Sequence, residues 1–282
     1  MSLTDIYAQQ GKYLDNMVGA FADQLQGVIS KAQARLIARL QKQLVIENGR
    51  IAMQPQNLRT LRQLDDLFAD EMDKAGYGAL IDAFVEKFPG QLKFMSQVIE
   101  EINATLKRPL IPVKPTGATT DMLASFQVNV TDALQAVVAN AARAALTRGL
   151  YNVAGLSFGK LTETLAGAFG RSLSEARALA ETGMSIFSRV AMNGQFAVVQ
   201  AGQKAPLLYD YSGPNDSLVR PFCRRMLDED KPRTMAEWEQ LPNGSTLSNP
   251  AVNGGGWGCR HQIQVNVESL RRAAAAQMAL AA

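Results

Sequence analysis

The sequence predicts a mainly α-helical protein that ends in a small, loop-rich α+β module. Before residue 206, apolar residues recur every three or four positions through several segments, which is the spacing of one helix face. From about residue 206 onward, prolines and glycines interrupt every helical period. A short alternation of apolar and polar residues at 263–267 predicts a strand within this last part.

The first element expected is one long helix near the N-terminus. Its apolar positions alternate between spacings of three and four, so they lie along one helix face. We expect this face to pack on the core of its own chain, although a helix of such length also suits a seam with another chain. The stripe consists of Leu14, Val18, Phe21, Leu25, Val28 and Ala32, and it continues with Leu36 and Leu40.

A β-hairpin is expected after the first helix. Asn48 and Gly49 stand between two apolar runs, and both residue types tolerate the positive φ that a two-residue hairpin turn requires. The alternative is that Gly49 ends a helix. Asn57 is then expected to be the N-cap of a helix that glycines stop at Gly76.

The middle of the chain contains a predicted linker. Helices are expected at 80–88 and 92–106, and the segment 107–120 that follows carries three prolines and a glycine, which no helix crosses. The expected organisation is a helical domain at 1–106, a Pro-rich linker at 107–120, a central helical region at 121–205, a C-terminal module at 206–267 and an Ala-rich tail at 268–282.

The central region is expected to form Ala-rich helices at 122–146, 160–169 and 174–200, with Ser174 as the N-cap of the last. Basic residues outnumber acidic ones near its end. Such an excess suits contact with DNA or with an acidic partner surface, and it also suits an ordinary solvated helix face. The basic residues are Arg143, Arg148, Lys160, Arg171, Arg177, Arg189 and Lys204.

Composition excludes several classes of protein. The 282 residues carry a formal net charge of +3, which is too small to indicate nucleic-acid binding by itself. No apolar run approaches the roughly 18 residues of a membrane span, and the first residues hold no signal-peptide core. We therefore expect a protein made in a cytoplasm. The motifs of P-loop, dinucleotide-binding and zinc-protease enzymes are absent.

The chemistry-bearing residues gather in the C-terminal module. Cys223 and Cys259 are the two cysteines and His261 is the only histidine, so we expect these three to converge. They could bind zinc with Asp216 as a fourth ligand. They could instead form a disulfide, a Cys–His nucleophile pair, or simply buried thiols beside a hydrogen-bonded histidine in a tight glycine-rich turn.

The order of rare residues in this module resembles the C-terminal part of phage Mu F-like minor head proteins. The pattern is D-x-x-x-R-P-F-C, then N-G, then G-G-x-x-C-R-H followed by a strand, and it covers about residues 206–267. Many members of the family end instead in C-R-C, so this chain holds fewer soft ligands. The residues that carry the pattern are Asp216, Arg220, Cys223, Asn243, Gly244, Gly254, Gly255, Cys259, Arg260 and His261.

The resemblance implies a structural protein of the virion rather than an enzyme. A Mu F-like protein is expected near the portal or the head–tail junction, in several copies, with a role in head morphogenesis or genome ejection. Its partners would be the portal or adjacent head–tail proteins, and contact with DNA is possible. The resemblance implies no required cofactor and no catalytic residue. The alternative is an enzymatic or toxin-like activity in the Cys- and His-containing module.

Overall fold

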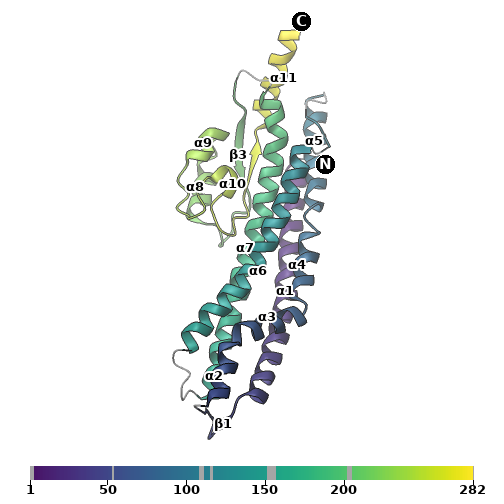
Figure 1. Cartoon of the computed structure of the whole chain (residues 1–282). Helices are drawn as coiled ribbons and strands as arrows, with labels where there is room; N and C mark the ends of the chain where they lie inside the picture. Colours follow the sequence, from purple (N-terminus) through teal and green to yellow (C-terminus); the bar gives the residue numbers. More distant parts are fainter. Residues whose placement is uncertain are drawn as a thin grey trace. The chain divides into compact units, whose positions relative to one another are not determined.

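The computed structural model describes residues 3–52, 54–107, 111–114, 117–150, 157–201 and 205–281. Helices account for 72% of the chain, and the strands are short and antiparallel (Figure 1). The mainly α fold class with a small α+β module at the C-terminal end is therefore confirmed. No described helix is long and apolar enough to cross a membrane.

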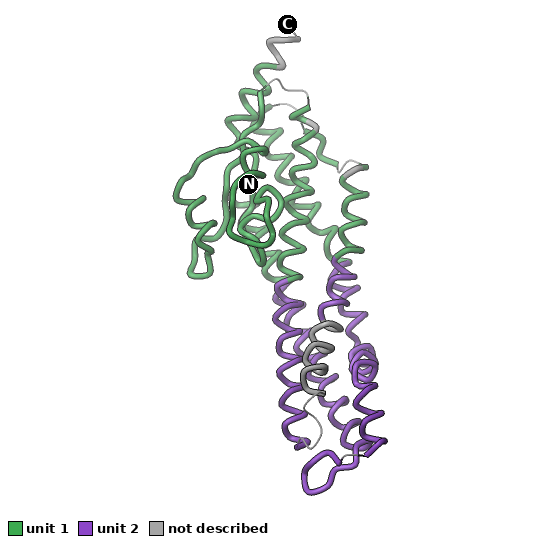
Figure 2. The backbone as a smooth tube through the Cα atoms, turned by 60° about the vertical axis from the view of Figure 1, so that its left-hand side comes forward, with its two compact units in different colours: residues 1–17, 86–129, 179–282 green, residues 18–85, 130–178 purple. Residues whose placement is uncertain are grey.

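The chain forms two compact units that interleave along the sequence (Figure 2). Unit 1 contains residues 1–17, 86–129 and 179–282, and unit 2 contains residues 18–85 and 130–178. Three long helices contribute to both units. The contiguous domains expected from the sequence stay a prediction, because a division by contacts does not test which segments fold on their own.

Unit 2 is a helical bundle with a small hairpin. Its core includes two aromatic pairs, Phe21 with Phe84 at a centroid distance of 4.4 Å and Phe68 with Phe169 at 4.8 Å. Its elements are the larger part of α1 (Leu3–Gln43), β1 (Ile46–Glu47), β2 (Arg50–Ile51), α2 (Pro55–Arg62), α3 (Leu64–Lys74), α4 (Tyr77–Val85) and parts of α6 (Gly117–Leu150) and α7 (Phe158–Ala201).

The apolar stripe of α1 packs within its own chain, as expected. Leu25, Leu36 and Leu40 are fully buried. Val28 is only half-buried and Ile29 is buried in its place, because a helix of 3.6 residues per turn drifts away from a strict repeat of three and four.

The hairpin prediction is confirmed and the Asn57 prediction is wrong. Asn48 and Gly49 both adopt positive φ, 49° and 74°, between the paired strands β1 and β2. Helix α2 already begins at Pro55. The buried Asn57 amide instead bonds the backbone of Val45 through both N–H and C=O, and that of Ala52. These bonds satisfy backbone groups of Val45 and Ala52, which flank the hairpin. The Asn57 side chain therefore binds the hairpin and does not cap a helix.

Two helix boundaries also differ from expectation. The helices expected at 160–169 and 174–200 are one continuous helix, α7, so Ser174 is an interior residue. The glycine at 170 does not break it, because an isolated glycine only weakens a helix. Helix α6 begins at Gly117, inside the expected linker. Within that linker, Ile111 is buried and its backbone bonds the Asn103 amide.

Unit 1 contains the C-terminal module together with parts of α1, α6 and α7. In its three-stranded sheet β3 lies between β4 and β5, and Tyr209 and Tyr211 of β3 face the buried side. The strand expected at 263–267 is present as β5, but it ends at Val265 and helix α11 begins at Val267. The elements are α5 (Gly90–Thr105), β3 (Leu208–Ser212), α8 (Pro221–Glu229), β4 (Arg233–Thr234), α9 (Met235–Gln240), α10 (Pro250–Asn253), β5 (Gln262–Val265) and α11 (Val267–Ala281).

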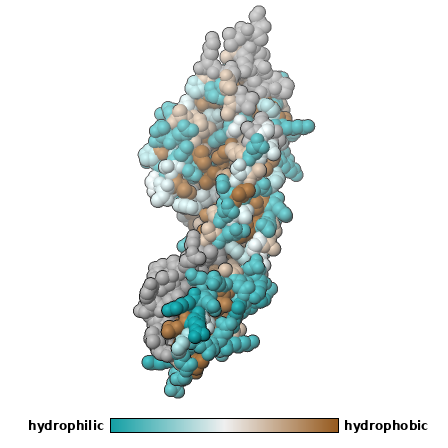
Figure 3. All heavy atoms as spheres, in the orientation of Figure 1, coloured by the Kyte–Doolittle hydropathy of each residue, from teal (hydrophilic) through white to brown (hydrophobic). Residues whose placement is uncertain are grey.

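The visible surface is mostly polar. On the face drawn in Figure 3, hydrophilic side chains surround smaller apolar patches. Isolated exposed apolar residues are ordinary for a folded protein. The large exposed hydrophobic residues among the described side chains are Leu58, Val128, Leu218 and Trp257.

Candidate functional site

Helix α7 holds the C-terminal module through a buried arginine. Arg189 is 1% exposed, and its guanidinium donates to three backbone carbonyls: His261 O at 2.9 Å, Val252 O at 2.8 Å and Cys259 O at 2.7 Å. One turn later on α7, Asn193 donates to Ala251 O at 3.2 Å. The planar fork of arginine suits several carbonyls at once, so this side chain fixes the loop that precedes β5.

An aromatic layer supports the interior of the module. The Tyr211 ring is stacked on His261 with a centroid distance of 5.2 Å and on Trp238 at 5.4 Å, and it meets Phe222 edge-on at 6.0 Å. Trp238 is fully buried and donates its indole N–H to Tyr209 O. These contacts place the Tyr211 hydroxyl on β3 beside both cysteines.

The two cysteine sulfurs lie next to each other in the interior. Cys223 on α8 and Cys259 before β5 are 1% and 3% exposed, and their Sγ atoms are 3.8 Å apart. This distance is far above the roughly 2.05 Å of a disulfide bond, and both cysteines are free. The Tyr211 hydroxyl lies 3.3 Å from Cys223 Sγ and 3.6 Å from Cys259 Sγ.

A glycine turn encloses both sulfurs. A Cβ added to Gly254 would lie 2.7 Å from Cys259 Sγ and 3.0 Å from Nη2 of Arg189, and one added to Gly255 would overlap Cys223 Sγ. The backbone N–H of Gly255 donates to Cys259 Sγ at 3.1 Å. Only glycine allows this approach, which confirms the sequence prediction that the turn brings backbone close to the cysteines.

His261 completes the cluster. Its Nδ1 lies 3.9 Å from Cys259 Sγ, at the outer limit of a hydrogen bond to sulfur. Its Nε2 is buried and has no hydrogen-bond partner among the described residues. The ligand atoms of Cys223, Cys259 and His261 all lie within 4.8 Å of one another, so the convergence expected from the sequence is confirmed for these three.

The contact between the two sulfurs lowers the pKa of one thiol and raises the pKa of the other. The hydrogen bond with Cys223 lowers the pKa of the Cys259 thiol, and His261, the charge of Arg189 and the Gly255 N–H lower it further. The same hydrogen bond, together with burial, raises the pKa of Cys223. Burial, together with the neighbouring sulfurs, raises the pKa of Tyr211. One proton shared by two sulfurs leaves the thiolate at the sulfur that has the other donors.

Asp216 does not join this cluster. It is exposed, and both carboxylate oxygens accept from Arg260 at 2.7 Å, a hydrogen bond that holds the pKa of Asp216 below its usual range. Asp216 therefore forms its ion pair with Arg260 and not with Arg220, which lies four residues along the chain. Arg220 lies instead against the glycine turn, with its Cδ 3.7 Å from the position of an added Gly255 Cβ. Among the described residues, the group of candidate metal ligands contains Cys223, Cys259 and His261 and does not include Asp216.

Asn243 and Gly244 organise the loop between α9 and α10. The Asn243 amide donates to Leu247 O at 2.8 Å and to Gly254 O at 2.9 Å, and its oxygen accepts from Ser245 N. Gly244 adopts a φ of 69°, which glycine tolerates without strain. The residues of this Asn-Gly pair therefore tie the loop to the start of the glycine turn.

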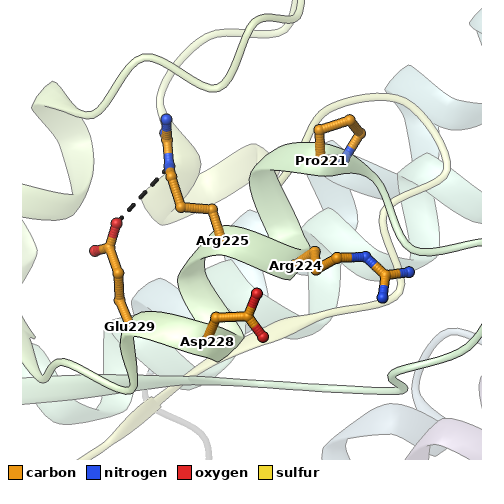
Figure 4. A pocket seen from close by; sticks show the side chains of 5 residues that line it. All are labelled: Pro221, Arg224, Arg225, Asp228 and Glu229. Carbon is orange, nitrogen blue, oxygen red and sulfur yellow. Dashed lines mark ion pairs between the residues drawn. The ribbon is translucent and has the colours of Figure 1, made fainter.

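A separate surface pocket lies on the solvent side of α8. Figure 4 shows the side chains that line it, with Arg225 Nε 3.9 Å from a carboxylate oxygen of Glu229. Basic and acidic groups are balanced here. The lining residues are Pro221, Arg224, Arg225, Asp228 and Glu229. This face of α8 is exposed, whereas the other face of the helix buries Phe222, Cys223 and Met226.

Sequence reasoning missed two residues that build the site. Arg189 was grouped with the basic residues expected on a solvated or DNA-binding face, but it is buried. No sequence motif pointed to Tyr211. The alternation Tyr209-Asp210-Tyr211-Ser212, which predicts a strand with both tyrosines on one face, is the signal that could have located it. Of the other basic residues, the side chains of Arg143, Arg148 and Lys204 lie outside the described residues.

Comparisons with protein-family models, with curated proteins and with solved structures found no match.

Proposed function

We propose that this protein is a structural minor head protein of a tailed bacteriophage, associated with the portal or the head–tail junction. The observation that carries the proposal is the ordered set of rare residues that resembles the Mu F-like C-terminal module, from Asp216 to His261. Its expected partners are the portal and adjacent head–tail proteins, and it would reside in the virion in several copies.

The positions of these residues support a structural role over a catalytic one. Arg260 and Asp216 pair with each other, and Asn243 bonds the loop backbone. Cys223 and Cys259 are at most 3% exposed. Reactive cysteines are partly exposed so that a substrate can reach them, so the buried thiols disfavour an enzymatic or toxin-like activity at this site.

The test is the composition of purified particles. Virions banded by density are expected to contain this chain at a fixed ratio to the portal protein, and antibody labelling is expected to place it at one vertex. Particles that lack the chain, although it accumulates in the infected cell, would contradict the proposal. A turnover activity that disappears in Cys223→Ser would favour the enzymatic alternative.

A further inference from the structure

We propose that Cys223, Cys259 and His261 bind one zinc ion that holds the C-terminal module together. The inference starts from geometry. Two thiolates at about 2.3 Å from a tetrahedral ion are separated by about 3.8 Å, and the two sulfurs here are 3.8 Å apart. Nδ1 of His261 lies 3.9 Å from Cys259 Sγ, slightly above the S–N separation of about 3.5 Å that a tetrahedral zinc site requires.

The second observation is that His261 is buried without adequate partners. A neutral imidazole keeps one N–H donor and one acceptor nitrogen. Nε2 has no partner among the described residues, and the contact of Nδ1 with sulfur is long. A buried polar group left without a hydrogen bond destabilises the fold. A metal ion at Nδ1 would replace this long contact with a coordination bond to the lone pair of the neutral imidazole, and Nε2 would then carry the ring proton.

The surroundings of the sulfurs suit thiolates. The N–H of Gly255 points at Cys259 Sγ, and the hydroxyl of Tyr211 points at Cys223 Sγ. Such donors orient metal-bound sulfur and stabilise its negative charge. Two thiolates also neutralise the charge of a dication, so the loaded site would place no net charge in the interior.

The ligands come from two separate segments, α8 and the loop between α10 and β5. Cys223 belongs to α8, Cys259 follows the glycine turn, and His261 directly precedes β5. The sheet beside them has strands of two to five residues. Modules with such short elements bury little apolar surface, and a structural zinc ion commonly supplies the missing stability. Three protein ligands leave one position of a tetrahedral ion for a solvent molecule.

The test uses the full chain, purified under a phosphine reductant and without chelators. Zinc is expected at one equivalent per chain. After removal of zinc and addition of Co²⁺ alone, the protein is expected to show a thiolate-to-cobalt charge-transfer band and the visible bands of tetrahedral cobalt. The spectrum reports sulfur ligation directly in the unmodified chain, so it does not depend on whether a variant folds.

Variants then assign the ligands. Cys223→Ser and Cys259→Ser are expected to lose zinc and the charge-transfer band. Met226→Leu is the matched control, because it changes another buried side chain of α8 and removes no proposed ligand, and it is expected to retain both. A native chain that takes up neither zinc nor cobalt, or cobalt binding that persists in both cysteine variants, would overturn the inference. A disulfide found under non-reducing conditions in the freshly purified protein would overturn it as well.

Discussion

Nη2 of Arg189 donates to the backbone oxygen of Cys259 at 2.7 Å, and the same guanidinium reaches two further carbonyls of the module. A fully buried arginine normally has a carboxylate partner. Here three backbone carbonyl oxygens accept its hydrogen bonds instead. The hydrogen bond with Cys223 is the main cause that lowers the pKa of the Cys259 thiol, and the nearby charge of Arg189 lowers it further.

Replacing Arg189 with lysine is expected to destabilise the protein even though the charge is kept. Lysine cannot reach three separated carbonyls with one ammonium group, so about two hydrogen bonds of roughly 1.5–3 kcal/mol each are lost. We expect a decrease of about 3–6 kcal/mol in the free energy of unfolding, measured by urea denaturation. The control is Arg171→Lys, at an exposed position of the same helix, with an expected change within about 0.5 kcal/mol. Equal effects at both positions would show that the carbonyl contacts contribute nothing.

A second prediction concerns the space beside Cys223. The Gly255→Ala substitution would place a methyl group on the sulfur, and we expect it to destabilise the module by about 1–3 kcal/mol through overpacking. Gly167→Ala is the control, since its Cβ would meet nothing within 4 Å on an exposed part of α7. That change is expected to stabilise the helix by up to about 1 kcal/mol. Thermal unfolding of both variants decides, and an unaffected Gly255→Ala would mean that the turn is looser than described.

Local signals were enough to predict the fold class. The Asn48-Gly49 turn and the stripe of α1 depend on backbone conformation and helical spacing, which can be read within a few neighbouring residues. The convergence of Cys223, Cys259 and His261 could also be predicted, because these types are rare in this chain and occur close together.

Residues whose roles depend on distant contacts could not be predicted in the same way. Asn57 has the residue type of a helix cap, yet its amide bonds Val45, twelve residues earlier. Arg189 has the sequence context of a surface cation, and its acceptors lie 63 to 72 residues later. Asp216 lies four residues from Arg220, yet its partner is Arg260, 44 residues away. Spacing along the chain carries no information about such partners.

The core of unit 2 gives a third prediction. Phe21 is 2% exposed and its ring contacts Phe84 at 4.4 Å. Truncation in Phe21→Ala is expected to lower the free energy of unfolding by about 3–5 kcal/mol, since it removes buried apolar area and leaves a cavity. Gln24→Ala, on the exposed side of the same helix, is expected to change stability by less than about 0.5 kcal/mol. Under the proposed function, virions formed with Phe21→Asp would also lack the protein, and normal incorporation would contradict that expectation.

The last prediction concerns acid stability and depends on Glu71 in unit 2. This carboxylate is 5% exposed and accepts from Arg35 at 2.8 Å and from Arg39 at 3.0 Å. Burial by itself would raise the pKa of Glu71, but the two arginine hydrogen bonds outweigh it and hold the pKa below the ordinary value of 4.5. Because the folded state then binds the proton less tightly than the unfolded state, the carboxylate stabilises the fold fully above the ordinary pKa. This contribution is lost as the pH falls through the lower pKa of the folded state.

The measurement is urea unfolding at a series of pH values from about 6 down to about 3. The wild-type protein is expected to lose stability over the lower part of this range. Glu71→Gln is expected to be less stable near neutral pH, because both arginines lose a charged partner, and to depend less on pH below 4.5. Part of the dependence should remain in that variant, because hydrogen bonds from Lys74 and Arg39 also lower the pKa of Asp70. Glu163→Gln, at an exposed position, is the control and is expected to follow the wild-type profile. An unchanged profile in Glu71→Gln would show that this carboxylate is not the group whose protonation weakens the fold.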